Sequence, residues 1–321
     1  MKVILLIFCF IFSSSCIAQQ ATTKYLVFDD MANFWQAYDK MVVNGDSAEQ
    51  VQLIQSQYID KASYNLRLML PILHYSALKY RANINAYPKF WKGLRERSRI
   101  LMGNYKEIVE ALERLKKIYH HIELPDIDFM VGCFEFGGKP FLHDVMIGIE
   151  VALADGNFDI SRYRDNIKEF DSYTIDAVIY FVIHETIHTR QPDFTAKDLL
   201  TSCIMEGSCD FITELVTGKP LKRPYIITGN NFEKKIWEAF KKQMNGTDHE
   251  DWLYNKGLVV KGEEDLGYFM GYSICKYYYE HSDNKKQAIR RIINLNYTRH
   301  SVVYKFFKDS QYENKFKENG Q

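Results

Sequence analysis

A nearly apolar segment that runs directly into two histidines constrains this chain more than any other feature. Residues 175–183 read Ile-Asp-Ala-Val-Ile-Tyr-Phe-Val-Ile, and the sequence His184-Glu185-Thr186-Ile187-His188 follows without a break. Such a run is typical of a buried helix, and residues four apart lie on one face of a helix. The side chains of His184 and His188 therefore point to the same place. Their two imidazoles are expected to bind one metal ion together.

The third metal ligand is expected on the next predicted helix. Glu206 follows His188 by 18 residues, which is enough for a turn and a return. Asp210 lies one helical turn after Glu206 and is expected to accept a hydrogen bond from a ligating histidine. Glu214 shares the same face and is the reserve ligand. A different spacing, with a third histidine six residues after His188, is excluded because Phe194 stands there.

Glu185 is predicted to act in chemistry rather than in metal binding. It lies about 100° around the helix from His184, where a carboxylate can reach a water on the metal without binding the metal itself. Two imidazoles and one carboxylate leave a fourth position for water, which is the catalytic pattern of zinc sites. Zinc lowers the pKa of that water, and Glu185 would take its proton. Hydrolysis of peptide bonds is the reaction that this arrangement favours.

Composition narrows the class of protein. The 321 residues carry 41 Lys and Arg against 41 Asp and Glu, and 46% are hydrophobic. A folded protein is therefore expected, and a nucleic-acid binder is excluded because no excess of positive charge is present. Four cysteines follow the leader, in no CxxC arrangement. They are too sparse for a disulfide scaffold, so buried thiols are expected at Cys133, Cys203, Cys209 and Cys275.

The first twenty residues, Met1–Gln20, read as an export signal. One lysine precedes an apolar stretch from Val3 to Phe12, and a serine run and small residues follow. The stretch is too short to cross a bilayer as a helix, which needs about 20 residues. Cleavage after Ala18 would give an exported periplasmic or secreted protein. Lipidation of Cys16, giving a membrane-anchored lipoprotein, is the alternative.

The hydrophobic pattern predicts an α+β fold that is mainly helical with a small mixed sheet. Helices are expected across residues 33–121, 173–190, 199–217 and 265–280, and strands within 126–136 and 145–153, on either side of Gly137-Gly138 and Pro140. We divide the chain into a signal peptide (1–18), a helical N-terminal region (19–124) and a metallopeptidase region (125–321). No linker of low complexity marks the second boundary.

These motifs resemble those of the gluzincins, the thermolysin-like zinc proteases in which HExxH precedes ExxxD. More closely, the chain is similar to a bacterial family of predicted zinc-dependent proteases of unknown substrate, exported proteins related in pattern to gliding-motility lipoproteins. The similarity spans roughly Phe34 to Tyr272. Its segments are Phe34–Asp39, Tyr58–Lys61, Tyr87–Trp91, Ile147–Glu150, His184–Gln191, Glu206–Gly207 and Asp265–Tyr272.

The resemblance implies a zincin-like catalytic domain and assigns roles to individual residues. The zinc ligands would be His184, His188 and Glu206, with Glu185 as the general base and Asp210 as the residue that orients a ligand; the reasoning from spacing selects the same five. The resemblance further implies that the strand at Ile147–Val151 is the sheet edge that pairs with an extended peptide. It also implies an oxyanion-stabilising residue downstream, for which Tyr268 and Tyr272 are the candidates.

Two functions follow from these observations. The first is an exported zinc metallopeptidase acting on a peptide or protein substrate, with no nucleic-acid partner. The second is a non-catalytic exported component, a lipoprotein or assembly protein that retains the fold. The intact Glu185 favours the enzyme, because a purely structural metal site has no use for a carboxylate placed to deprotonate water.

Overall fold

The computed structural model describes residues 24–154, 174–191, 198–254 and 264–317. Within these ranges the chain is mainly helical and contains one mixed four-stranded sheet, which confirms the α+β prediction. The predicted signal peptide and Cys16 lie outside the described residues. Among the helices that are described, none is long and apolar enough to cross a membrane.

The N-terminal part of the chain forms one short strand and then a series of helices. These elements are β1 (Leu26–Val27), α1 (Asp29–Met41), α2 (Ser47–Ile54), the π-helical turn η1 (Gln55–Ile59), α3 (Tyr64–Ile72), α4 (Ala77–Ala86) and α5 (Pro88–Ile118). Local sequence signals mark the start of two of these helices. Asp46 caps α2 by accepting hydrogen bonds from the backbone N–H groups of Ala48 and Glu49, and Pro88 occupies the first turn of α5.

The rest of the sheet and the C-terminal helices follow. The strands are β2 (Ile127–Met130), β3 (Gly138–Phe141) and β4 (Asp144–Gly148). The helices are α6 (Ile149–Ala152), α7 (Ile175–His188), α8 (Leu199–Thr217), α9 (Pro224–Gln243), α10 (Leu266–Glu280), α11 (Lys285–Ile293), α12 (His300–Ser310) and the 3₁₀ turn η3 (Tyr312–Phe316). The predicted helices at 173–190, 199–217 and 265–280 are thereby confirmed to within two residues at each end.

The order of strands in the sheet, β1-β2-β4-β3, corrects two expectations. β1, β2 and β4 are parallel, and β3 is antiparallel to β4. The segment at 145–153 is a strand only as far as Gly148, after which α6 begins. The expectation that Ile147–Val151 forms the edge of the sheet is wrong, because β4 pairs on both sides. The edge next to α7 is β3, a strand that the sequence pattern did not predict.

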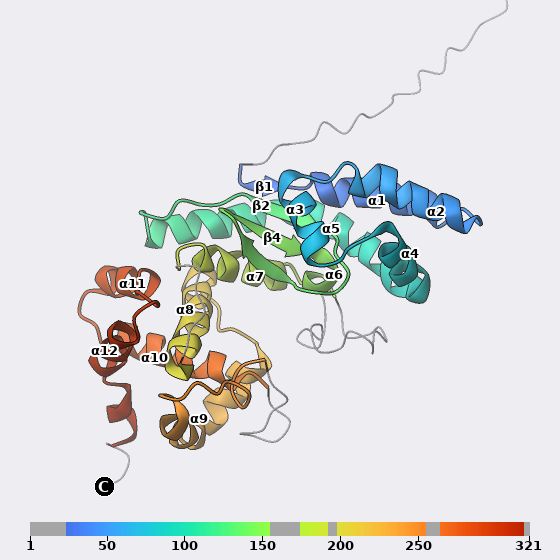
Figure 1. Ribbon diagram of the computed structural model, residues 1–321. Coiled ribbons are helices and arrows are strands. Elements are labelled where there is room, and N and C mark those ends of the chain that lie inside the picture. Colours follow the sequence, from blue (N-terminus) through green and yellow to red (C-terminus); the bar gives the residue numbers. More distant parts are fainter. Residues whose placement is uncertain (1–23, 155–173, 192–197, 255–263, 318–321) are drawn as a thin grey trace, which may run out of the picture.

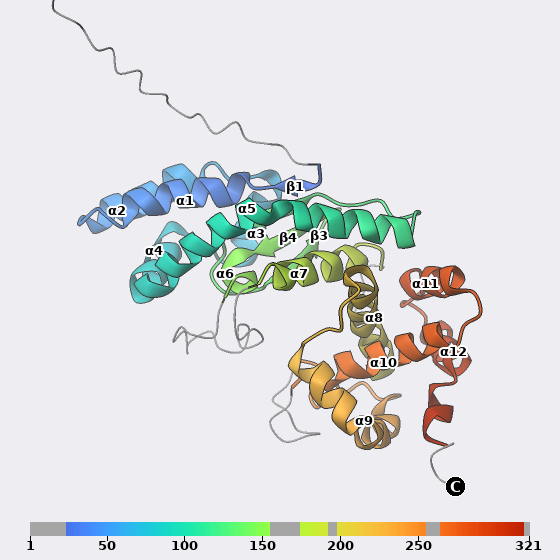
Figure 2. The same ribbon diagram turned by 180° about the vertical axis from the view of Figure 1, so that it is seen from behind.

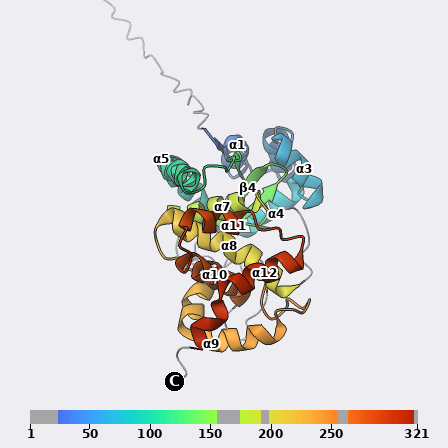
Figure 3. The ribbon, with the colours of Figure 1, turned by 90° about the vertical axis from the view of Figure 1, so that its left-hand side faces the viewer.

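Helix α7 lies between the sheet and the C-terminal helices (Figures 1 and 2). It packs against β3, β4 and α5 on one side and against α8 on the other. Figure 3 shows the molecule from the side, with α8 to α12 grouped at the end opposite α1 and α3. The sheet contains strands from both sides of the boundary expected between residues 124 and 125, because β1 pairs with β2. The histidine helix thus lies at the centre of the molecule.

Candidate metal centre

The two histidines occupy the last turns of α7, and the sequence explains why the helix forms there. The side chain of Thr174 caps the first turn by accepting a hydrogen bond from the backbone N–H of Ala177. The apolar residues that follow are buried against the sheet and α5. This packing holds the helix in place and buries its polar end. His184 is only 5% exposed and Glu185 only 9%.

The second ligand helix, α8, begins at a capping aspartate and crosses α10 at very close range. Asp198 accepts hydrogen bonds from the backbone N–H and the hydroxyl of Thr201, and Gly218 ends the helix with a left-handed conformation (φ 66°). A Cβ atom on Gly207 would collide with the α10 backbone at Gly271 and Tyr272. Gly207 thus allows α8 and α10 to approach closely, and Glu206 next to it lies beside the two histidines.

Three ligand atoms converge as predicted. The Nε2 atoms of His184 and His188 are 3.0 Å apart, and Oε2 of Glu206 lies 3.2 Å from Nε2 of His188 and 3.4 Å from Nε2 of His184. Tetrahedral ligands at zinc bond lengths of 2.0–2.1 Å are about 3.3 Å from one another. The triangle therefore has the size that a zinc ion requires.

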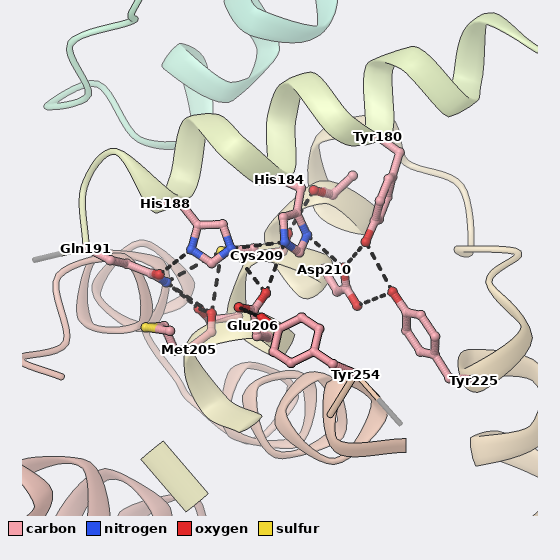
Figure 4. A network of polar contacts seen from close by, with 12 residues as sticks. Tyr180, His184, His188, Gln191, Met205, Glu206, Cys209, Asp210, Tyr225 and Tyr254 are labelled. Carbon is pink, nitrogen blue, oxygen red and sulfur yellow. Dashed lines mark hydrogen bonds and ion pairs between the residues drawn. The ribbon is translucent and has the colours of Figure 1, made fainter. Parts of the chain in front are cut away.

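Each histidine is oriented by a partner on its other ring nitrogen (Figure 4). Nδ1 of His184 donates to Oδ1 of Asp210 at 2.9 Å, and Nδ1 of His188 donates to Oε1 of Gln191 at 2.6 Å. Gln191 is itself fixed, because its amide donates to the backbone oxygen of Met205 at 3.1 Å. These bonds place both protons on Nδ1 and leave both Nε2 lone pairs for a metal. Asp210 stands where the sequence predicted it, whereas Gln191 was not predicted.

Asp210 has two further donors that hold its carboxylate in place. Tyr180 donates to Oδ1 at 2.8 Å and Tyr225 donates to Oδ2 at 2.9 Å. The guanidinium of Arg223 lies 4.6 Å from the centre of the Tyr180 ring. Asp210 is fully buried, so these bonds satisfy a carboxylate that has no access to water. The partner of His184 is thereby fixed from three directions.

Cys209 is a ligand candidate that the sequence reasoning missed. One ligand atom each from His184, His188 and Cys209 lies within 4.8 Å of the other two. This buried group can hold a metal ion. The four cysteines after the leader are all buried and unpaired, as expected. The signal that could have singled out Cys209 is its spacing, because it follows Glu206 by three residues and shares that face of α8.

Glu185 lies against the edge strand of the sheet. A Cβ atom on Gly138, the first residue of β3, would lie 2.6 Å from Cγ of Glu185, and one on Gly137 would lie 2.5 Å from the ring of Phe181. The sequence pattern predicts a break between strands at these two glycines. Their role in the structure is to let β3 lie directly on α7, which places the backbone of the edge strand next to the Glu185 carboxylate.

The two glutamates of the centre have pKa values shifted in opposite directions. Burial raises the pKa of Glu185, and the nearby histidines only partly offset it, which suits a group that must gain and release a proton. Burial also acts on Glu206, but His188 and His184 outweigh it and hold the pKa of Glu206 well below its usual range. Glu206 therefore stays ionised, as a ligand must.

The predicted tyrosines divide between the metal centre and a separate cluster. The ring of Tyr268 lies 6.4 Å from that of His184, centre to centre. The hydroxyl of Tyr272 donates to Oε2 of Glu214 at 2.8 Å, and Lys276 pairs with Oε1 at 2.8 Å. Glu214, the reserve ligand, is thus held in an ion pair, and the hydroxyl of Tyr272 is directed to that pair. Tyr268 stays the better placed of the two tyrosines.

A third tyrosine, which the sequence did not single out, contacts a ligand directly. The hydroxyl of Tyr254 donates to Oε1 of Glu206 at 3.1 Å. Its ring packs edge-on against Tyr268, and the residue as a whole is 76% exposed. Tyr254 and Asp265 both have left-handed backbones (φ 57° and 60°), and Oδ1 of Asp265 accepts the Tyr254 backbone N–H at 2.6 Å. No local sequence signal predicts this contact.

No protein-family model, no curated protein and no solved structure matches this chain. The resemblance to zinc proteases therefore stays a prediction.

Proposed function

We propose that this protein is an exported zinc-dependent metallopeptidase with a zincin-like catalytic centre. The observation that carries the proposal is the triangle formed by Nε2 of His184, Nε2 of His188 and Oε2 of Glu206, with edges of 3.0–3.4 Å. Two imidazoles and one carboxylate form the ligand set of catalytic zinc sites, which keep a fourth position open. Asp210 and Gln191 support the assignment, because ligating histidines usually donate their other N–H to such acceptors.

The chemistry would be shared between the ion and Glu185. Zinc in such a site activates water as a nucleophile and polarises a carbonyl group. Glu185 takes the proton of the attacking water and then donates it to the departing amine, so the carboxylate ends the cycle as it began. Its raised pKa brings the carboxylate closer to the pH at which both steps proceed. Tyr268 and Tyr254 lie close enough to the ligands to be tested as oxyanion donors.

The edge strand β3 would bind the substrate as an added strand. The backbone N–H of Gly148 donates to the oxygen of Gly137 at 3.2 Å, so in this antiparallel ladder residues 137, 139 and 141 face β4. The backbone groups of Gly138 and Pro140 then face outward. Pro140 has no N–H to offer, so Gly138 supplies the outward donor. An extended peptide paired there would cross the Glu185 carboxylate.

A second candidate function is a non-catalytic exported metal protein. The position of Cys209 favours it, because a thiol that completes the set with His184, His188 and Glu206 would close the fourth coordination position. Such a closed site would stabilise the contact of α7 with α8 and leave Glu185 without a catalytic role. A lipoprotein or assembly component would use the metal in this structural way.

Replacing Glu185 by Gln decides between the two functions. The variant should keep its fold and its zinc, because Glu185 is not a ligand, and should lose at least about 100-fold of its hydrolysis of a peptide library, as expected for loss of a general base. Zinc content and peptide cleavage are measured on the same samples, with Glu214→Gln as the matched control. A wild type that binds zinc but cleaves nothing contradicts the enzyme.

A cobalt-substituted protein tests the second candidate directly. Absorption from a sulfur ligand that disappears in Cys209→Ser would establish a closed site with Cys209 as a ligand. A spectrum that is the same in the wild type and in Cys209→Ser would leave the open site with Glu206 as the third ligand.

A further inference from the structure

A second buried glutamate lies far from the metal ligands in the sequence and close to the edge strand. Glu150 is the second residue of α6, directly after β4, and is 1% exposed. Its Oε2 accepts the backbone N–H of Gly132 at 2.8 Å, and its Oε1 accepts that of Phe134 at 3.1 Å. One carboxylate therefore holds the loop that leaves β2 against the helix that follows β4.

The loop is shaped around this carboxylate. Phe134 has a left-handed backbone (φ 69°), which is uncommon for a bulky residue and turns its N–H toward Glu150. A Cβ atom on Gly132 would lie 2.6 Å from Oε1 of Glu150 and 2.7 Å from the hydroxyl of Tyr75. Successive N–H groups that converge in such a turn form a concave site for an anion. Here the anion is a side chain of the same protein.

The surroundings of Glu150 are polar but largely uncharged. Tyr58 and Tyr80 donate to the backbone oxygen of Val131, at 2.5 Å and 2.8 Å, and the buried thiol of Cys133 lies in the same loop. Burial raises the pKa of Glu150 to about 7, while the backbone hydrogen bonds from Gly132 and Phe134 lower it. The free energy of burying this carboxylate is unfavourable, so its retention calls for a role.

That role follows from where the loop leads. Two residues after Phe134 the backbone oxygen of Phe136 contacts Gly148, at the end of β4, so closely that a Cβ atom on Gly148 has no room. Gly148 also donates its N–H to Gly137. Gly138 then begins β3 and packs on Glu185. Through Gly132 and Phe134, the carboxylate of Glu150 thus holds the segment that leads into β3.

We propose that Glu150 is a positioning residue that holds β3 as the peptide-binding edge above Glu185. The inference rests on the proposed function in one respect, that a peptide pairs with β3. The clamp, meaning the two hydrogen bonds from Gly132 and Phe134 to Glu150, is a property of the fold. It acts through the loop Gly132–Phe136 and touches neither the substrate nor the metal ligands.

Glu150→Gln tests the clamp with little change in size. The amide keeps one acceptor, but its NH₂ group faces the second backbone N–H, so one buried donor loses its partner. Hydrogen–deuterium exchange of the backbone N–H groups of Lys139 and Phe141, which face β4, should become at least about tenfold faster, while exchange of α7 and the zinc content stay as in the wild type. Glu135→Gln, in the same loop but exposed and paired with Lys79, is the matched control.

Kinetics separate positioning from a general structural role. With the longest good substrate from a peptide library, KM of Glu150→Gln should rise about tenfold while kcat changes less than about twofold. With a short substrate that does not reach β3, both constants should stay unchanged. A loss of kcat on both substrates, or unchanged KM on the long one, overturns the proposal. If the wild type cleaves no peptide, the proposed function fails, and the exchange rates alone decide the clamp.

Gly132→Ala keeps the proposal falsifiable if Glu150→Gln does not fold. It retains the negative charge but drives a methyl group into Oε1 of Glu150, which should displace the carboxylate. Faster exchange of the backbone N–H groups of Lys139 and Phe141 is again expected. Exchange in β3 that matches the wild type in both variants overturns the clamp.

Discussion

Two buried glutamates, Glu206 on α8 and Glu150 on α6, have pKa values shifted in opposite directions. Glu206 is 7% exposed and Glu150 is 1% exposed. Burial alone raises the pKa of both, yet the pKa of Glu206 is held well below its usual range by His188 and His184, whereas that of Glu150 rises to about 7. The difference lies in the partners: imidazoles can carry charge, and the backbone N–H groups that face Glu150 cannot.

The comparison shows how one residue type serves two purposes. A carboxylate that stays ionised next to histidines can bind a metal ion, and the cost of its burial is offset by charge. A carboxylate that meets only backbone dipoles cannot offset that cost fully, and its benefit is the shape that it imposes on a loop. We therefore expect Glu206 to bind the metal ion and Glu150 to position the loop that leads into β3.

The largest effect is expected when Glu206, the proposed zinc ligand, is replaced. Glu206→Ala leaves two imidazoles and should weaken zinc binding by more than about 100-fold, beyond the 10–100-fold typical of losing an outer partner such as Asp210. Zinc per chain is measured after dialysis against a weak chelator. Glu150→Gln and Glu214→Gln should both retain zinc. Full zinc content in Glu206→Ala would instead assign the third ligand to Cys209.

A smaller effect is expected in the pH dependence of stability. Because the pKa of Glu150 is raised from 4.5 to about 7 in the folded protein, its contribution to stability is fully present below pH 4.5 and is lost as pH rises through 7. The shift corresponds to about 3 kcal/mol. The free energy of unfolding of the wild type should therefore fall relative to that of Glu150→Gln by about this amount over that range.

Urea unfolding at several pH values, after zinc has been removed with a chelator, measures this difference in the free energy of unfolding. Removing zinc excludes pH-dependent metal binding, and the titration of the freed ligand residues is common to both proteins and cancels in the difference. The tyrosine and thiol groups nearest Glu150 do not titrate in this range, because burial raises the pKa of Tyr75 and of Cys133. Parallel stability curves for the wild type and Glu150→Gln would show that Glu150 stays ionised, and the contrast with Glu206 would be lost.

The two glutamates also differ in how far the sequence could predict them. Glu206, His184 and Asp210 lie on helices, where a spacing of four residues fixes a shared face. Only one tertiary contact had to be inferred, the return of α8 onto α7, and the spacing of 18 residues between His188 and Glu206 supported it. The ligand triangle was therefore predictable, and so were the three helices around it.

The edge strand and the Glu150 loop depend on contacts that no local pattern records. Gly137 and Gly138 are typical of a turn, but in the structure they make room for Phe181 and Glu185. This packing turned a predicted break into β3 and moved β4 to the interior of the sheet. Tyr254 likewise reaches Glu206 from 48 residues away in the sequence. These features follow from tertiary packing, which overrides local turn propensity.

The smallest effect is expected at Tyr254, the partner of Glu206 that is not a histidine. Its hydroxyl holds Oε1, which leaves Oε2 as the oxygen directed at both Nε2 atoms. Tyr254→Phe removes this one hydrogen bond, worth about 1 kcal/mol, so zinc should bind about fivefold more weakly. A competition titration with a chromophoric chelator measures the change, with the exposed Tyr64→Phe as control. If the affinity is unchanged, the imidazoles alone set the state of Glu206, and the contrast with Glu150 depends only on charge. If the affinity falls as expected, neutral hydrogen-bond donors stabilise both Glu206 and Glu150. Only the histidines then distinguish the two carboxylates.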